Sequence, residues 1–310
     1  MRPLPASAIV GTWGTILLPL NTDESIDWAR LRDEVAALAA AGVDGIYSNG
    51  SAGEFYAQTE VEFDEVSAVL AEMCEARGLA FQIGVCHMSA QISLARLRRA
   101  VHLKPGAVQV VLPDWYAPTV EEVVAFLARM AEAAGPVGLV IYNPGNAKRV
   151  LTAADWGAVT ERVPQIVGLK VAGGDAAWYA TMAPVLRRVA VFVPGHTLAT
   201  GRARGAAGSY SNVACLNPRG ARRWYELMTS DPAQALAWEG RIQAFFKAHI
   251  IPFITEQSYT NTAVDKLLAA IGGWADVGTR LRWPYRGIPE AEAQRLREVA
   301  RRELPELMNA

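Results

Sequence analysis

The chain alternates between two patterns of apolar residues. Short runs rich in valine and isoleucine end in glycine or polar residues, which is typical of buried strands. Eight such runs occupy residues 9–19, 43–48, 80–86, 107–112, 137–142, 166–171, 189–193 and 207–211. Between them, apolar residues recur every three or four positions, which predicts helices. These helical stretches occupy residues 28–41, 60–77, 90–101, 120–134, 153–163, 176–188 and 198–204.

Eight strands separated by helices favour one α/β architecture, a (β/α)8 TIM barrel. A doubly wound open sheet is the alternative, but it requires a phosphate-binding glycine loop after the first strand. Here the first strand is followed by Leu20-Asn-Thr-Asp23 instead. After residue 217 only helical patterns remain, at 218–228, 233–249, 262–271 and 289–303. We therefore expect a barrel over residues 1–216 and a helical region over 217–310 that packs on it.

Composition excludes several classes of function. The 310 residues carry a net charge of −1 with no basic block, so nucleic acid is not an expected partner. No run of about 18 apolar residues predicts a membrane span. The three cysteines and four histidines lack the spacings of disulfide frameworks or metal sites, and no metal is expected. The N-terminal residues lack the apolar run of a signal peptide, so we expect a cytoplasmic protein.

The sixth predicted strand contains one lysine, Lys170, within the apolar run Ile166-Val-Gly-Leu-Lys-Val171. Burying an ammonium group costs several kcal/mol unless it is paired or loses its proton. A desolvated lysine is the nucleophile that Schiff-base chemistry on a carbonyl substrate requires. The alternative is a structural lysine at a strand end, paired with a carboxylate.

Other candidate residues follow the ends of other predicted strands, where a barrel of this kind holds its active site. Tyr142 ends the fifth strand, His196 follows the seventh, and Tyr210 lies in the eighth. After the second strand comes a loop of small residues that contains Ser51. Its backbone N–H groups can hold a carboxylate. Tyr142, Ser51 and His196 could each also have an ordinary structural role.

Three motifs give the chain a family resemblance. The loop Gly50-Ser-Ala-Gly-Glu54, the run Tyr142-Asn-Pro144, and Gly168-Leu-Lys170 followed by Gly174-Asp175 occur in order at three strand ends. Together they resemble the dihydrodipicolinate synthase/N-acetylneuraminate lyase family of class I, Schiff-base-forming pyruvate lyases. The resemblance extends from about residue 15 to residue 212 and is weaker in the C-terminal helices.

The resemblance implies catalytic roles for three residues. Lys170 matches the lysine that forms an imine with pyruvate or another 2-keto acid, so no separate cofactor is expected. Tyr142 matches the tyrosine that carries protons to and from the substrate. Ser51 matches the loop hydroxyl that bonds this tyrosine and helps to bind the substrate carboxylate. The remaining implied or candidate substrate-binding residues are Gly50, Ala52, Trp115, Gly195, His196 and Tyr210.

Some positions depart from the family pattern. Ala52 lacks the second loop hydroxyl, and Trp115 replaces a tyrosine that synthases donate across a dimer interface, although Tyr116 follows directly. Lys148 or Arg149 is only a loose substitute for the arginine that binds the aldehyde substrate's carboxylate. These departures favour an aldolase, lyase or dehydratase acting on a 2-keto acid.

Four alternatives remain open. The chain could be a dihydrodipicolinate synthase, a 2-keto-3-deoxy sugar acid dehydratase, a catalytically silent 2-keto acid binding protein, or a barrel that uses a metal or phosphate. The family resemblance also implies a homo-oligomer, a tetramer built as a dimer of dimers. The second substrate is not identified by any of these motifs.

Overall fold

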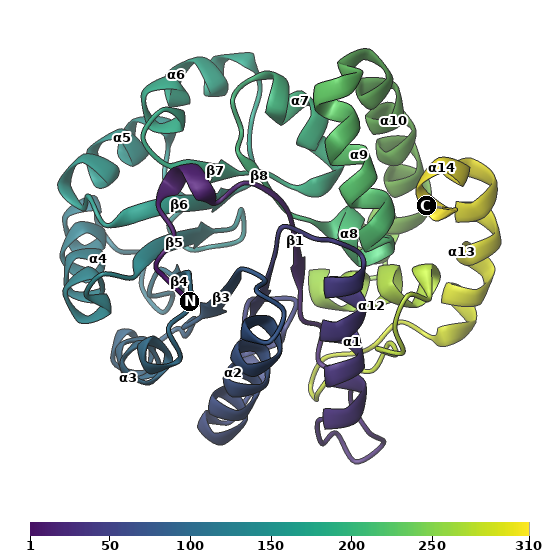
Figure 1. Ribbon diagram of the computed structural model, residues 1–310, viewed down its shortest axis with the longest axis horizontal. Coiled ribbons are helices and arrows are strands. Elements are labelled where there is room, and N and C mark those ends of the chain that lie inside the picture. Colours follow the sequence, from purple (N-terminus) through teal and green to yellow (C-terminus); the bar gives the residue numbers. More distant parts are fainter. Residues whose placement is uncertain (310) are drawn as a thin grey trace.

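A computed structural model describes residues 1–309 of the chain. Eight parallel strands pair in chain order, and the last pairs with the first, so the sheet closes into a barrel (Figure 1). The predicted (β/α)8 fold is confirmed. The strands are β1 (Gly11–Thr15), β2 (Gly45–Ser48), β3 (Phe81–Gly84), β4 (Ala107–Val111), β5 (Gly138–Asn143), β6 (Ile166–Val171), β7 (Ala190–Phe192) and β8 (Gly208–Tyr210).

Helices follow the strands and form the outer layer of the barrel (Figure 1). They are α1 (Trp28–Ala40), α2 (Glu60–Glu75), α3 (Ala90–Ala100), α4 (Val120–Ala134), α5 (Ala153–Arg162), α6 (Ala176–Leu186), α7 (Leu198–Ala203) and α8 (Asn212–Leu216). The seven helices predicted between the strands are present within two residues at each end. Only α8 was missed, since five residues are too few to show a helical period.

Capping explains why three of these helices begin where they do. Thr59, Thr119 and Thr152 each accept a hydrogen bond from a backbone N–H at the third helical position, and an acidic side chain there bonds back. Such reciprocal capping satisfies N–H groups that the first turn leaves without partners. The three threonines therefore fix the first residues of α2, α4 and α5.

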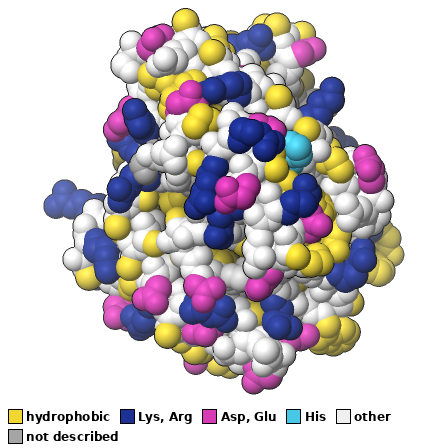
Figure 2. Space-filling view, turned by 90° about the vertical axis from the view of Figure 1, so that its right-hand side faces the viewer, with side chains coloured by type: hydrophobic (Ala, Val, Ile, Leu, Met, Phe, Trp, Pro, Cys, Tyr) yellow, Lys and Arg dark blue, Asp and Glu magenta, His cyan; other side chains and the backbone are white. Residues whose placement is uncertain are grey.

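The C-terminal helices pack against α7 and α8 and form one side of the molecule, green to yellow in Figure 1. They are α9 (Pro218–Ser230), α10 (Pro232–Phe245), α11 (Ile251–Thr255), α12 (Asn261–Gly272), α13 (Glu290–Glu303) and α14 (Pro305–Met308). The expected boundary at residue 216 falls between α8 and α9, and residue 310 of the expected helical region lies outside the described part. On this side of the molecule, charges of both signs are intermixed (Figure 2).

The long helix predicted over residues 233–249 differs from the observed structure. The regular α-helix, α10, ends at Phe245. A wider π-helical turn, Phe246–Ile250, follows it and leads into α11. Pro252 lies in the first turn of α11 and has no N–H to donate, so regular α-helical bonding cannot run through it. This irregular segment brings Phe246 and Ile250 to the cavity described below.

The barrel interior contains aromatic and polar side chains as well as aliphatic ones. Trp13, Tyr47, Phe192 and Tyr210 form a buried cluster there. The Tyr210 hydroxyl donates a hydrogen bond to Gln82 Oε1 at 2.6 Å. This interior supports the side chains that reach the carboxyl ends of the strands.

Candidate functional site

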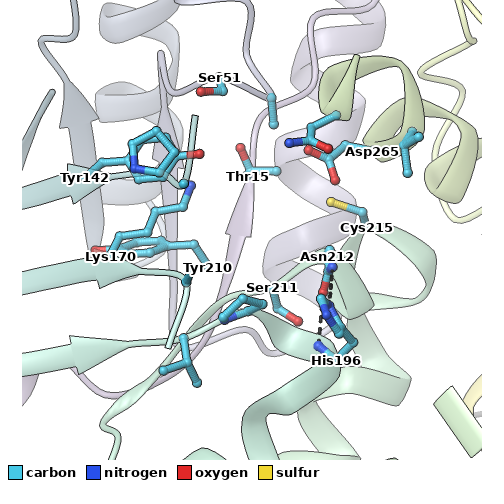
Figure 3. A pocket seen from close by; sticks show the side chains of 18 of the residues that line it. Thr15, Ser51, Tyr142, Lys170, His196, Tyr210, Ser211, Asn212, Cys215 and Asp265 are labelled. Atoms are coloured by element: carbon cyan, nitrogen blue, oxygen red, sulfur yellow. Dashed lines mark hydrogen bonds between the residues drawn. The ribbon is translucent and has the colours of Figure 1, made fainter. Parts of the chain in front are cut away.

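A cavity of about 400 Å3 lies at the carboxyl ends of the strands (Figure 3). Of the residues selected from the sequence, six line it: Ser51, Ala52, Tyr142, Lys170, His196 and Tyr210. They come from five different strand ends or the loops that follow them. Parallel strands of a barrel share one carboxyl edge, so residues far apart in sequence meet there.

Lys170 enters this cavity from β6 and is surrounded by tyrosines. Its Nζ lies 3.0 Å from the Tyr47 hydroxyl. The same atom lies 4.0 Å from the ring centre of Tyr142, 4.9 Å from that of Tyr47 and 5.4 Å from that of Tyr210. In residues 1–309, no carboxylate oxygen comes within ion-pair distance of Lys170. Lys170 is therefore not a structural lysine paired with a carboxylate.

The three tyrosines around Lys170 differ in burial. Tyr47 is 2% exposed and Tyr210 is 7% exposed. Burial raises the pKa of both hydroxyls above its usual range, so both stay protonated at neutral pH. Tyr142 is only half-buried, and its ring lies beside the ammonium group. It is therefore the most accessible of the three tyrosines to a molecule in the cavity.

The loop after β2 forms another wall of the cavity. Asn49 and Glu54 have positive φ angles of 54° and 53°, which turn the chain sharply around Ser51. The backbone oxygen of Ser51 accepts a hydrogen bond from Thr262 Oγ1 at 2.9 Å. Within the described chain, the Ser51 hydroxyl makes no hydrogen bond to Tyr142, in contrast to the role that the family implies.

Gly50 does not line the cavity but lies directly behind Tyr47. A Cβ atom at Gly50 would come 2.6 Å from Cε2 of the Tyr47 ring, closer than real contacts allow. Gly195 has a similar position behind its neighbours, because a Cβ there would come 2.5 Å from Ser211 Oγ. Both glycines thus give room to residues that reach the cavity.

His196 is held in a fixed orientation at the cavity wall. Its backbone N–H donates to Asn212 Oδ1 at 3.2 Å, so the amide nitrogen of Asn212 faces His196 Nδ1 at 2.8 Å. The ring also stacks on Phe246, with 5.4 Å between centres. Desolvation lowers the pKa of His196, so the ring is neutral at pH 7 and carries its proton on Nε2.

Trp115 lies away from the cavity on the surface of the chain. Its side chain is 76% exposed, and that of Tyr116 is 81% exposed. Lys148 Nζ donates to the Trp115 backbone oxygen at 2.7 Å and lies 5.3 Å from its ring centre. Within one chain, neither aromatic residue forms a wall of the site.

Sequence reasoning missed several residues that line the cavity, of which Asp265 carries the most chemistry. It projects from α12, and burial raises the pKa of its carboxyl to about 7, while the nearby Lys170 opposes that shift. Tyr47, Thr15 and Asn261 were also missed. Thr15 and Tyr47 lie at the carboxyl ends of β1 and β2, a position that could have identified them. Asp265 lies on a helix and gave no such signal.

A second cavity of about 460 Å3 adjoins the first and shares six residues with it: Ser51, Tyr142, Pro144, Asn146, Ile254 and Asn261. Its other walls combine aromatic and apolar side chains with a few polar ones: Phe55, Tyr56, Met88, Val111, Leu112, Asp114, Ala147, Tyr259, Thr260, Thr262 and Tyr285. Among the described residues that line the two cavities, Lys170 is the only lysine or arginine. An anionic group in the second cavity would therefore have no cationic partner there.

Residues 1–309 contain no group of three or more His, Cys, Asp or Glu side chains that could hold a metal ion. None of the helices in the same range is long and apolar enough to cross a bilayer. The side chains that line the first cavity include an amine, phenols, a carboxyl group, an imidazole and aliphatic hydroxyls.

Comparison with known proteins agrees with the motifs. The chain is 28% identical over 301 residues to the trans-O-hydroxybenzylidenepyruvate hydratase-aldolase of Sphingobium xenophagum, covering 91% of this chain and 90% of the relative. It is also 28% identical over 173 residues to the N-acetylneuraminate lyase of Enterobacter sp. (strain 638), covering 55% of this chain and 57% of that enzyme.

Solved structures share the fold. One is YagE, a prophage protein of the dihydrodipicolinic acid synthase family from E. coli K12, in complex with pyruvate. It matches with a TM-score of 0.83 at 17% identity, covering 96% of this chain and 99% of that one. The N-acetylneuraminate lyase of Fusobacterium nucleatum matches with a TM-score of 0.79 at 19% identity, covering 95% and 99%.

The model of the dihydrodipicolinate synthetase family matches residues 8–302, nearly the whole chain. The named relatives in this comparison are lyases, which supports a lyase here. The resemblance read from the three motifs is confirmed: the chain belongs to the dihydrodipicolinate synthetase family.

Proposed function

We propose that this chain is a lyase that binds pyruvate or another 2-keto acid as an imine on Lys170 and makes or breaks a carbon–carbon bond beside it. The observation that carries this proposal is the position of Lys170. Its amine ends in a cavity at the carboxyl edge of the barrel, among three tyrosines and without a carboxylate partner. A structural lysine would be satisfied by an ion pair.

The chemistry follows from the groups present. The Lys170 amine adds to the keto carbon, and the resulting carbinolamine loses water to form an iminium ion. The iminium accepts the electron pair of the adjacent bond when that bond breaks. Tyr142, the accessible phenol beside the amine, transfers protons during addition and loss of water. The Tyr47 hydroxyl, 3.0 Å away, fixes the direction in which the amine points.

The 2-keto acid carboxylate needs an anion site near the imine. The loop that contains Ser51 and Ala52 offers backbone N–H groups and one hydroxyl at the cavity wall. We assign the loop a binding role because of these donors, to which Ala52 can contribute only its backbone N–H group. Ser51 is its single side-chain donor.

The second reactant carries no anionic group in this proposal. Among the described residues, the adjoining cavity is lined by aromatic, apolar and uncharged polar side chains and by Asp114, but by no lysine or arginine. This favours aldol chemistry of the kind named for the Sphingobium relative over a synthase or a sugar acid dehydratase. The aldehyde substrate of a synthase bears a carboxylate, which would have no lysine or arginine as a partner in the second cavity.

Borohydride trapping tests the proposal. The protein is incubated with pyruvate and sodium borohydride, digested, and the peptide that contains Lys170 is examined by mass spectrometry. We expect an adduct with the mass of reduced pyruvate in the wild type and in Lys247→Ala, an exposed control lysine, and none in Lys170→Ala. An unmodified Lys170 peptide in the wild type would overturn the imine, as would activity that a chelator abolishes. An adduct without turnover of any aldehyde or aldol would identify a silent binding protein.

We also propose that the chain forms a homo-oligomer through the segment after β4. Trp115 and Tyr116 are both largely exposed there. Neighbouring exposed aromatic side chains are typical of surfaces that bind another protein. The segment also adjoins the second cavity through Asp114, so a partner chain seated on it would cover that opening.

A further inference from the structure

Helix α12 is attached firmly to the loop that carries Ser51. Thr262 donates from its hydroxyl to the Ser51 backbone oxygen at 2.9 Å. One turn later, Lys266 Nζ donates to Glu54 Oε1 at 2.7 Å, and both of these side chains are fully buried. Asp265 lies between these two attachments. Its backbone position relative to the cavity is therefore fixed by the same contacts that hold the substrate loop.

The Asp265 carboxyl has no structural partner. Over residues 1–309, no hydrogen-bond donor and no lysine or arginine in ion-pair contact satisfies its oxygens. The fully buried carboxyl groups of Glu54 and Glu34 are hydrogen-bonded within the fold, whereas the side chain of Asp265 is only partly covered and faces the cavity. Among the described residues that line the first cavity, it is the only carboxyl group. An unsatisfied acid aimed into a cavity calls for a role in what the cavity binds.

Asp265 and Lys170 approach the same hollow from different sides. Figure 3 shows the carboxyl of Asp265 entering from α12 and the amine of Lys170 from β6, with Thr15 between them. A molecule held by Lys170 at one carbon can therefore extend toward Asp265, which lies one turn after Asn261, the α12 residue that lines both cavities. Tyr142 lies on the Lys170 side, beside the amine.

We propose that Asp265 is the general base and acid for the carbons beyond the imine, a role separate from that of Tyr142. This inference rests on the proposed imine at Lys170. In the cleavage direction, the Asp265 carboxylate takes the proton of the C4 hydroxyl while the C3–C4 bond breaks. The electron pair moves to the iminium nitrogen, which leaves an enamine on Lys170 and a free aldehyde.

The same carboxyl then completes the cycle. It returns its proton to C3 of the enamine, which restores the iminium ion, and water hydrolyses this to pyruvate and the free amine. One proton has moved from oxygen to carbon, and no oxidant or further reactant is required. The buried hydroxyls of Tyr47 and Tyr210 serve this step poorly, because burial holds them in the protonated form.

The role can be tested with pyruvate alone. The last step run in reverse removes a C3 proton from the pyruvate imine, so the methyl group of pyruvate exchanges with D2O. We expect the wild type to catalyse this exchange, as followed by proton NMR. Asp265→Asn should slow it at least about 100-fold. Borohydride trapping at Lys170 should persist in this variant, since the amine and Tyr142 are unchanged.

Two further variants make the test decisive. Asp276→Asn, which removes an exposed carboxylate shortly after α12, should exchange like the wild type. Asp265→Glu keeps a carboxyl group on a longer side chain and should retain more exchange than Asp265→Asn. If Asp265→Asn does not fold, the exchange rate of Asp265→Glu tests the role instead. Wild-type exchange in an Asp265→Asn protein that still traps pyruvate would overturn this inference alone. Failure of the wild type to trap pyruvate would instead overturn the proposed imine.

Discussion

Lys266 Nζ lies 2.7 Å from Glu54 Oε1, and the side chains of both residues are 0% exposed. This ion pair joins α12 to the loop after β2, two segments more than 200 residues apart in the sequence. The backbone N–H of Arg282 donates to the other Glu54 oxygen at 3.1 Å. The pair thus connects the C-terminal helices to the wall of the candidate site.

Removing one partner of this pair should destabilise the fold strongly. Lys266→Met leaves Glu54 as an unpaired buried charge, so we expect a loss of about 3–5 kcal/mol in the free energy of unfolding. Glu54→Gln with Lys266→Met should lose less than the single lysine variant. Urea unfolding measures both. Glu298→Gln, which breaks an exposed ion pair with Arg301, is the control and should change stability by about 1 kcal/mol or less. Equal effects at the two pairs would contradict the prediction.

The pKa of Asp265 predicts how stability changes with pH. Burial raises its folded pKa to about 7 from an ordinary value of 3.8, against the opposing effect of Lys170. The other titratable groups that interact with it, Tyr47, Tyr56 and Cys215, have pKa values raised by burial and stay neutral. The pKa of the Asp265 carboxyl is thus higher in the folded chain than in the unfolded chain. Its contribution to the free energy of unfolding is fully present below the unfolded pKa and is lost as the pH rises through 7.

Asp265→Asn removes this dependence. The variant should be as stable as the wild type near pH 4. As the pH rises from 4 to 7 it should become the more stable protein, and above pH 7 its free energy of unfolding should be higher by roughly 2–4 kcal/mol. Denaturant unfolding of both proteins at several pH values measures the difference. A constant difference across this range would show that Asp265 is ionised throughout in the folded chain.

Sequence reasoning placed the barrel and its lysine well because the signals were local and repeated. Eight apolar runs each had a single strand-like pattern, and the shared carboxyl edge brought Lys170, Tyr142 and Ser51 to one cavity. Asp265 was missed because a polar residue on an amphipathic helix has the pattern of a solvent-facing position. Only tertiary packing turns that face of α12 toward the cavity.

The hydroxyl of Tyr47 should assist imine formation. Tyr47→Phe keeps the ring in the barrel interior but removes the group that lies 3.0 Å from Lys170 Nζ. Losing one such hydrogen bond costs about 0.5–1.5 kcal/mol, so we expect imine formation with pyruvate to slow roughly 2- to 10-fold. The rate of imine formation is measured by adding borohydride after different incubation times with pyruvate and quantifying the adduct on Lys170. Tyr225→Phe, whose hydroxyl contacts the Ala207 backbone outside the barrel interior, should leave it unchanged. A similar slowing in both variants would argue against a specific role.

Gly50 should act through the same tyrosine. In Gly50→Ala the new Cβ would meet Tyr47 Cε2 at 2.6 Å, so the ring must shift and its hydroxyl must leave Lys170. We expect slower imine formation, at least as slow as in Tyr47→Phe, together with a lower melting temperature. Gly157→Ala is the matched control, because a Cβ there meets nothing within 4 Å and alanine favours the helix. Normal trapping kinetics in Gly50→Ala would show that the Tyr47 ring can move without consequence.

The exposed pair after β4 leads to a prediction about assembly. Trp115 and Tyr116 are 76% and 81% exposed in the single chain, an unfavourable state for two adjacent large aromatic side chains. If they form an interface, Trp115→Ser with Tyr116→Ser should lower the molar mass measured by light scattering at micromolar concentration. Trp283→Ser removes an aromatic residue of similar exposure, 77%, from another part of the chain and should leave the mass unchanged. An unchanged mass in the double variant would place any subunit contact elsewhere, because the loss of two central aromatic anchors weakens an interface by several kcal/mol.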